Sequence, residues 1–161
     1  MVVANTWAWP VNGDLHFELF SHFIGGALGR LLIRHFNFFV NVMIPAGHRR
    51  RKVTAAEMTH YRRALPTPRR RNPSAIFPRD ITAARTFLAD LEQGLQGLTD
   101  MPTLIVWGDA DVAFRAKERR RWECLMPRHH TVVLAGAGHY LQSDAPTDFA
   151  NAVRAWCNKP K

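Results

Sequence analysis

Two acidic residues and one histidine stand at matching places in the sequence, directly after short apolar runs. Asp109 and Asp111 follow the run at 103–107, and His139 follows the run at 131–135. A carboxylate that accepts the Nδ1 proton of a histidine fixes the tautomer of the ring and stabilises its protonated form, which is the supporting half of a nucleophilic triad. The spacing therefore points to an acid–base pair. The plainer alternative is that Asp109 caps a helix and His139 fills a turn.

These side chains can meet if the two apolar runs are neighbouring strands of one parallel sheet. Each run is short and ends before a glycine, as buried parallel strands do. A basic segment at about 115–125 predicts a helix between them, and Pro146 suits the first turn of a second helix. The order strand, helix, strand, helix is typical of an α/β fold. In such folds ligands bind at the carboxyl ends of the strands.

The first half of the chain follows a different pattern. Between about residues 12 and 73, short stretches with Phe, His and Arg are interrupted by glycine and proline, which predicts small helices joined by loops. Further along, Asp80 is placed to cap a helix. The apolar residues of that predicted helix step by three and four along the chain: Ile81, Ala84, Leu88, Leu91, Leu95 and Leu98.

Length and composition describe one globular domain. The chain has 161 residues, of which 47% are hydrophobic and 11% aromatic, enough to build a core. No stretch approaches the roughly 18 apolar residues of a membrane span, and the N-terminus lacks the basic region of a secretory signal. We therefore expect a cytoplasmic protein without a membrane partner. The two cysteines, Cys124 and Cys157, indicate neither a disulfide framework nor a metal site.

Most of the net charge of +9 comes from one segment, the Arg-rich region at residues 49–71. It contains nine Lys and Arg residues and a single acid, Glu57. Such a region could bind an acidic partner, since Lys and Arg gain affinity for phosphates by releasing counterions. However, no aromatic stacking platform or zinc spacing accompanies it. We therefore expect a solvated, irregular surface, and nucleic acid is not an expected partner.

Two strings around the acid–base pair resemble the C-terminal part of the α/β-hydrolases, and most of all the haloalkane dehalogenases. The string LIVWGDAD at 104–111 matches the family pattern W-G-x-x-D, which implies that the triad acid is Asp111 rather than Asp109. The string GAGHYLQSDAP at 136–146 matches G-x-x-H and implies that His139 is the general base. Its tail, His-aromatic-Leu/Ile-Gln-x-Asp-x-Pro, is more particular to the dehalogenases and their epoxide-hydrolase relatives.

The resemblance extends upstream and implies a partial α/β-hydrolase fold, in which a helical cap is followed by the last parallel strands and helices of the sheet. The string NTWAWP at 5–10 is similar to the end of a core strand in such enzymes. On this basis residues 1–10 end a core strand, residues 11–77 form the cap, and residues 78–161 form the C-terminal part of the core. A strand stub at about 2–5 would then be an exposed edge, open to a partner or to aggregation.

The resemblance also implies hydrolytic cleavage of carbon–halogen bonds in two steps. An aspartate displaces halide to form an alkyl ester, and water activated by the histidine then cleaves the ester. The family carries that aspartate on a G-x-D-x-G elbow ahead of the cap, and no such pattern occurs in the 161 residues. The nearest spacing, Gly25 to Gly29, has Ala27 at its centre, and its glycines more simply permit close helix packing or a turn. We therefore expect a truncated segment without its nucleophile, which a remnant, a late start or a separately encoded N-terminal half would each explain.

The implied substrate is a small molecule, a haloalkane. An epoxide or ester hydrolase fragment is the first alternative, because acid and base are shared, and a noncatalytic protein that binds an acidic partner through the Arg-rich region is the second. No metal or organic cofactor is implied, since His129 and His130 lack further ligands at usable spacing. Trp7, Trp9 and Trp107 are expected to be packing residues rather than ligands of a halide.

Overall fold

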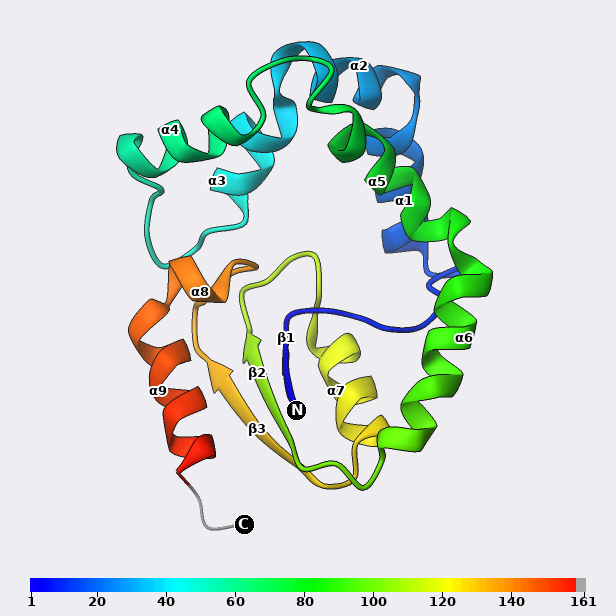
Figure 1. The fold of residues 1–161 in the computed structure, drawn as a ribbon, viewed down its shortest axis with the longest axis vertical. Coiled ribbons are helices and arrows are strands. Elements are labelled where there is room, and N and C mark those ends of the chain that lie inside the picture. The colour runs from blue at the N-terminus through cyan, green and yellow to red at the C-terminus, as the bar shows by residue number, and fades with distance from the viewer. Residues whose placement is uncertain (159–161) are drawn as a thin grey trace. The chain divides into compact units, whose positions relative to one another are not determined.

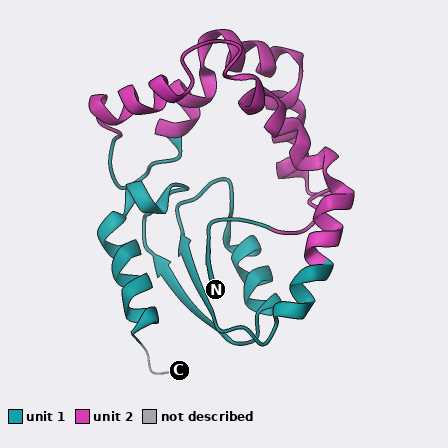
Figure 2. Cartoon of the chain, viewed as in Figure 1, with its two compact units in different colours: residues 1–7, 46–52, 93–161 teal, residues 8–45, 53–92 magenta. Residues whose placement is uncertain are grey.

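The computed structural model describes residues 1–158, which form two compact units (Figure 2). Unit 1 comprises Met1–Trp7, Ala46–Lys52 and the chain from Gln93 onward, and unit 2 comprises Ala8–Pro45 and Val53–Glu92. Unit 1 contains the sheet, and unit 2 is helical. The assignment of a cap and a core to particular ranges stays a prediction.

Three strands of unit 1 form a parallel sheet in the order β1-β2-β3 (Figure 1). They are β1 (Val2–Ala4), β2 (Thr103–Gly108) and β3 (His129–Leu134). Every residue of β2 is buried, as expected for the central strand of a parallel sheet. The predicted α/β class is confirmed, and so are the three predicted strands, although β3 begins two residues before the predicted run and therefore includes His129 and His130.

One hydrophobic cluster of unit 1 lies between the sheet and the C-terminal helix. The helices of this unit are α7 (Ala116–Leu125) between β2 and β3, then α8 (Leu141–Asp144) and α9 (Pro146–Cys157), with a 3-10 turn, η2 (Gln96–Leu98), before β2. The buried cluster is formed by Leu104, Val106, Leu134, Ala137, Leu141 and Ala145. Phe149, Val153 and Trp156 of α9 pack against it, and the start of α9 at Pro146 confirms the position predicted for this helix. Because strand side chains alternate between faces, Ile105 and Trp107 point away from α9.

Unit 2 is built from short helices, as predicted, and no strand occurs among its described residues. Its helices are α1 (Leu15–Gly25), α2 (Ala27–Phe36), the π-helix η1 (Phe39–Met43), α4 (Ala55–Ala64) and α5 (Asn72–Ala83). Two further helices, α3 (Ile44–Ala46) and α6 (Arg85–Leu95), run across its borders. Local signals set several ends: the side chain of Asp14 caps α1, and Thr54 and Glu57 form a capping box at the start of α4.

The prediction that Asp80 caps a helix is wrong. Asp80 lies within α5, which begins at Asn72. Pro73 stands in the first turn of α5, where the fixed φ of proline favours the helix and its missing N–H has no cost. The helix stops before Ala84, whose ψ of 29° leaves the helical region, and α6 follows as a separate helix.

Helix α1 has two contrasting faces. It buries Phe17, Ser21 and Gly25 and packs against α5, where a Cβ added at Gly25 would lie 2.7 Å from the backbone nitrogen of Arg79. This close approach confirms that the glycine permits helix packing. The opposite face is apolar and exposed, formed by Leu15, Leu19 and Phe23.

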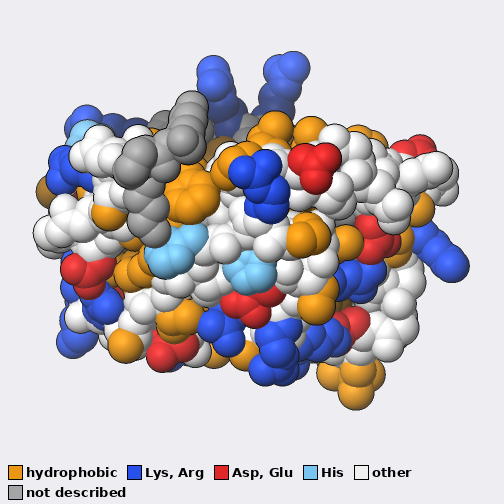
Figure 3. All heavy atoms as spheres, turned by 90° about the horizontal axis from the view of Figure 1, so that it is seen from below, with side chains coloured by type: hydrophobic (Ala, Val, Ile, Leu, Met, Phe, Trp, Pro, Cys, Tyr) orange, Lys and Arg blue, Asp and Glu red, His pale blue; other side chains and the backbone are white. Residues whose placement is uncertain are grey.

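The surface is mixed in character. In the view of Figure 3, basic side chains are interspersed with acidic and apolar ones. Within residues 1–158, no helix combines the length and the apolar character needed to cross a membrane.

The packing of α1 on α5 gives a test of the helical unit. Gly25→Ala should lower the free energy of unfolding by about 1 to 3 kcal/mol, because the new methyl group meets backbone that cannot move aside cheaply. Gly94→Ala is the matched control, since a Cβ there enters open space on α6 and should be neutral or stabilising by up to about 1 kcal/mol. Urea unfolding measures both, and equal effects of the two substitutions would contradict the packing argument.

Candidate active site

The loops that follow β2 and β3 leave the sheet at the same edge. The two strands are parallel and in register, so that their last residues, Gly108 and Leu134, are paired. Backbone contacts then join the loops: the N–H of Ala110 donates to the carbonyl of Ala137 at 3.1 Å. Gly108 has no room for a side chain, since a Cβ there would lie 2.4 Å from the Ala137 oxygen. The loops are therefore in direct backbone contact.

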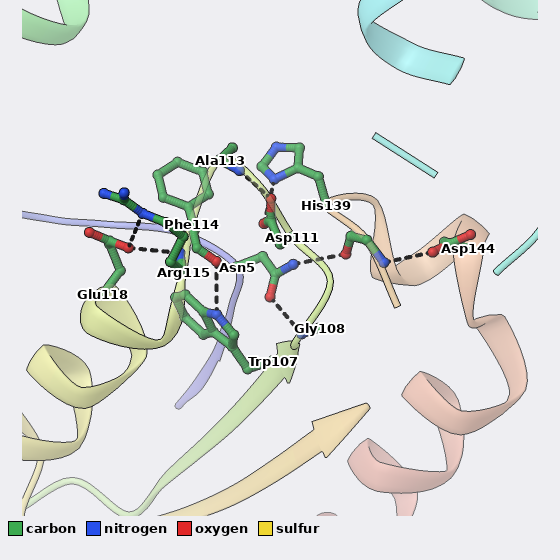
Figure 4. A network of polar contacts seen from close by, with 11 residues as sticks. Asn5, Trp107, Gly108, Asp111, Ala113, Phe114, Arg115, Glu118, His139 and Asp144 are labelled. Carbon is green, nitrogen blue, oxygen red and sulfur yellow. Dashed lines mark hydrogen bonds and ion pairs between the residues drawn. The ribbon is translucent and has the colours of Figure 1, made fainter. Parts of the chain in front are cut away.

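The structure brings Asp111 and His139 together at this edge (Figure 4). The Nδ1 of His139 lies 2.9 Å from Oδ2 of Asp111. The Asp111 side chain is fully buried, whereas that of His139 is 29% exposed. The other carboxylate oxygen of Asp111 accepts the N–H of Ala113 at 2.7 Å, which fixes the carboxylate. A buried acceptor at Nδ1 holds the proton on that nitrogen and leaves Nε2 as the acceptor.

Asp109 has a different partner. Its Oδ1 accepts the N–H of Gly136 at 2.6 Å, so this carboxylate ties the loop after β2 to the loop after β3. Gly136 has a φ of 72°, in the left-handed region that glycine adopts freely. The acid next to His139 is thus Asp111, the residue that the sequence pattern indicates.

Aromatic rings surround the histidine. The ring of Phe114 lies 5.3 Å from that of His139, and Tyr140 makes an edge contact at 4.8 Å. Phe114 is held from behind, because Trp7 stacks on it at 5.2 Å and Trp107 donates its Nε1 proton to the Phe114 carbonyl at 3.0 Å. Trp7 and Trp107 therefore act as packing residues, as expected, and restrict the positions open to the imidazole.

Asn5 ties the end of β1 to both loops. Its Nδ2 donates to the carbonyl of Gly138 at 2.9 Å, and its Oδ1 accepts the N–H of Gly108 at 3.0 Å. The residue is buried and has a φ of 34°, a conformation that asparagine tolerates better than most residues. We assigned it no role from the sequence. The only signal was its place at the end of an apolar stub, in line with the other two strand ends.

Asp144 is the second polar residue that we gave no role from the sequence. Its buried carboxylate accepts four backbone N–H groups, from Arg49, Arg50, Arg51 and Gly138. Burial alone would raise the pKa of Asp144, but these donors stabilise the charged form and hold the pKa below the usual value for an aspartate. In the sequence, Asp144 is marked by its place in the tail His-aromatic-Leu/Ile-Gln-x-Asp-x-Pro, five residues after His139.

The Arg-rich region is not the uniformly solvated surface that we expected. The side chain of Arg50 donates to the carbonyl of Ala135 at 2.8 Å and forms an ion pair with Asp148. In unit 2, Arg71 donates to the carbonyls of Leu65, at 2.8 Å, and Arg34, at 3.0 Å. These arginines stabilise loops and the end of a helix. Among residues 1–158, no three His, Cys, Asp or Glu side chains are grouped so that they could hold a metal ion.

Removing the Asn5 side chain should weaken unit 1. In Asn5→Ala, the Gly108 N–H and the Gly138 carbonyl would be buried without partners, so the free energy of unfolding should fall by about 2 to 4 kcal/mol. Asn12→Ala is the matched control, because that exposed side chain makes one hydrogen bond, to the Thr82 carbonyl, and its loss should change stability by about 0.5 kcal/mol or less. Urea unfolding compares the two, and similar losses would mean that Asn5 does not hold the loops.

The depressed pKa of Asp144 predicts a dependence of stability on pH. Asp144 has a lower pKa in the folded than in the unfolded chain, so its contribution to stability is complete above the unfolded value of about 3.9 and is lost as the pH falls through the folded value. The difference in free energy of unfolding between the natural chain and Asp144→Asn should therefore be constant near neutral pH and shrink below about pH 4. Denaturation at several pH values measures it. A difference that stays constant down to about pH 3 would contradict the lowered pKa.

Comparison with known proteins agrees with this geometry, although no family model matches the chain. The proteins named Haloalkane dehalogenase 2 from Mycobacterium tuberculosis and Mycobacterium bovis are 39% identical to it over 155 residues, which cover 95% of this chain and 54% of each relative. A haloalkane dehalogenase of Bradyrhizobium diazoefficiens is 29% identical over 134 residues, covering 80% of this chain and 43% of the relative. The chain thus spans about half the length of the curated relatives that it matches.

Solved structures give the same result for the fold. An ancestral haloalkane dehalogenase (node 2) superimposes with a TM-score of 0.82 at 26% identity, covering 96% of this chain and 57% of that one. The haloalkane dehalogenase DbeA from Bradyrhizobium elkani shares the fold, with a TM-score of 0.73 at 24% identity, over 86% of this chain and 49% of its own. The chain is therefore a haloalkane dehalogenase-like member of the α/β-hydrolase superfamily and corresponds to the C-terminal part of that fold.

Proposed function

We propose that Asp111 and His139 are the acid and the base of a hydrolase that cleaves carbon–halogen bonds. The observation that carries this proposal is the 2.9 Å contact between Nδ1 of His139 and the buried carboxylate of Asp111. Curated relatives that are named haloalkane dehalogenases and cover 95% of the chain support the same chemistry. They favour it over epoxide or ester hydrolysis and over a noncatalytic role for the Arg-rich region.

The contact defines what each residue does in the reaction. With its proton on Nδ1, the neutral imidazole presents a lone pair on Nε2, which Figure 4 shows pointing away from Asp111. A water molecule at Nε2 can lose a proton to the ring as its oxygen attacks an ester. The Asp111 carboxylate then stabilises the imidazolium without itself becoming protonated.

The reaction needs a nucleophile in addition to this pair. A carboxylate oxygen attacks the carbon that bears the halogen, the carbon–halogen bond breaks, and the halide leaves with the electron pair. Water activated by His139 then cleaves the alkyl ester, which releases an alcohol and regenerates the carboxylate. Because residues 1–161 contain no G-x-D-x-G elbow, we propose that this carboxylate comes from polypeptide outside these residues.

Two surfaces support the proposal that further polypeptide completes the protein. Among residues 1–158, strand β1 pairs with β2 alone, so its other edge is available to another strand. Helix α1 exposes Leu15, Leu19 and Phe23, and exposed apolar groups of this size commonly mark an interface. The relatives, which are about twice as long as this chain, have enough additional length to cover such surfaces.

A chimera tests the proposed roles. The half of the Mycobacterium tuberculosis relative that this chain does not match is fused ahead of Met1, and halide release from a short bromoalkane is measured. The fusion should release halide, whereas the chain alone should not. Asp111→Asn in the fusion should lower the rate by about 10³ to 10⁴-fold, because the histidine loses its correct tautomer and the support for its charge.

His139→Ala and His129→Ala form a matched pair of controls in the same chimera. His139→Ala should abolish hydrolysis of the ester. His129 is an exposed residue at the start of β3, where its Nδ1 contacts the Met126 carbonyl, and its substitution should leave the rate unchanged. His139→Ala should therefore release at most one halide per protein molecule, and a folded chimera whose sustained halide release does not exceed that of its His139→Ala variant would refute the proposed function.

A further inference from the structure

The carboxylate of Asp144 gathers backbone from two distant parts of unit 1. It accepts the N–H groups of Arg49 and Arg50 at 3.0 Å, of Arg51 at 3.2 Å and of Gly138 at 2.7 Å. The first three belong to the segment Ala46–Lys52, which is separated from Asp144 by more than 90 residues in sequence. The fourth immediately precedes His139. A single buried side chain therefore joins this segment to the loop that carries the histidine.

The same segment also binds the backbone of His139 itself. The N–H of His139 donates to the carbonyl of Gly47 at 2.8 Å. The approach is close, since a Cβ added at Gly138 would lie 2.2 Å from that Gly47 oxygen. Asn5 binds the carbonyl of Gly138 on the other side. Three successive polar groups of the backbone are thus hydrogen-bonded: the Gly138 N–H, the Gly138 carbonyl and the His139 N–H.

Side chains strengthen the link between the segment and α8. The Nε2 of His48 lies 2.7 Å from the hydroxyl of Ser143, and the His48 ring stacks on Tyr140 with centroids 5.3 Å apart. Arg51 donates from Nε to the Ser143 carbonyl. Tyr140 in turn touches the ring of His139. The contacts made by the segment therefore reach the imidazole by a second route.

We propose that Asp144 is a positioning residue for His139: by binding the segment 49–51 and Gly138 at once, its carboxylate holds the histidine where Nδ1 meets Asp111. This inference rests on the proposed function of the pair. Asp144 acts through the backbone and is not assigned a contact with substrate.

An ionised carboxylate suits this position because all of its partners are donors. Its two oxygens together offer about four lone-pair sites, enough for the four N–H groups. An asparagine offers one acceptor oxygen and would turn an NH₂ group toward N–H groups. Asp144→Asn, which is nearly isosteric, therefore removes the interaction with little change in volume.

Nuclear magnetic resonance of the histidine rings tests the proposal without any need for turnover. The full chain is labelled with ¹⁵N in histidine, and His139→Gln identifies the His139 signals. At a pH at which the ring is neutral, the natural chain should show His139 as the Nδ1-protonated tautomer, with a proton that exchanges slowly with water. In Asp144→Asn the tautomers should become mixed, and exchange of the Nδ1 proton should accelerate by about tenfold or more.

Asp148→Asn is the matched control, since Asp148 is an exposed aspartate of the neighbouring helix α9 that pairs with the Arg50 side chain. It should leave the His139 signals as they are. A folded Asp144→Asn with the natural tautomer and exchange rate would overturn the proposal. A loss of stability alone would accelerate exchange through more frequent opening, but it would leave the folded protein with the Nδ1-protonated tautomer, so the mixed tautomer is the result that distinguishes the two.

If Asp144→Asn does not fold, hydrogen exchange in the natural chain tests whether Asp144 positions His139. The amides of residues 49–51 and 138 and the Nδ1 proton of His139 should then become exposed in one common opening, at matching rates across a series of low urea concentrations. Exchange of the Nδ1 proton that is independent of those amides would overturn the proposal. Failure of the proposed function is distinguishable, since it would show as a chimera without halide release whatever the state of the His139 ring.

Discussion

Parallel pairing of β2 with β3 is the constraint on which the rest of the candidate site depends. Because the last residues of the two strands are paired, the loops that carry Asp111 and His139 begin side by side. Their backbones lie so close that Gly108 has no space for a side chain. Such proximity brings peptide groups into the buried interior, where each unpaired N–H or carbonyl would cost about 1 to 3 kcal/mol. The site must therefore be stabilised by hydrogen bonds to backbone.

Polar side chains from outside the two loops supply those bonds. Asn5 binds the end of β2 and the loop after β3, and Asp144 binds that second loop together with the segment 49–51. Both residues are buried. Their hydrogen bonds go to backbone groups and not to the His139 ring. Their role is to fix the backbone at Gly138, next to the residue that carries the imidazole. Precise placement of a base relative to its acid depends on such support, because small displacements weaken the hydrogen bond steeply.

The Arg-rich region takes part in the same arrangement. The Arg-rich region contributes its backbone to Asp144, and Arg50 and Arg71 bind carbonyl groups or an aspartate. Part of the basic charge of this region is therefore used within the protein. No G-x-D-x-G elbow occurs in the 161 residues, and the chain spans about half the length of the relatives that it matches. The chain thus contributes the acid and the base of the proposed reaction.

The sequence by itself determined the parallel strands and the helices that became α7 and α9, because apolar runs ended by glycine and the position of Pro146 are short-range patterns. Those patterns left Asp109 and Asp111 open as the partner of His139, and the resemblance to the dehalogenases indicated Asp111. The sequence analysis placed a helix start at Asp80, but the helix begins at Asn72, with Pro73 in its first turn and Asp80 in its interior. Only the tertiary structure decided the roles of Asn5 and Asp144. Their partners lie between 6 and 133 residues away in sequence. Because those partners are backbone groups, which every residue type carries, the residue types at the partner positions do not reveal the hydrogen bonds.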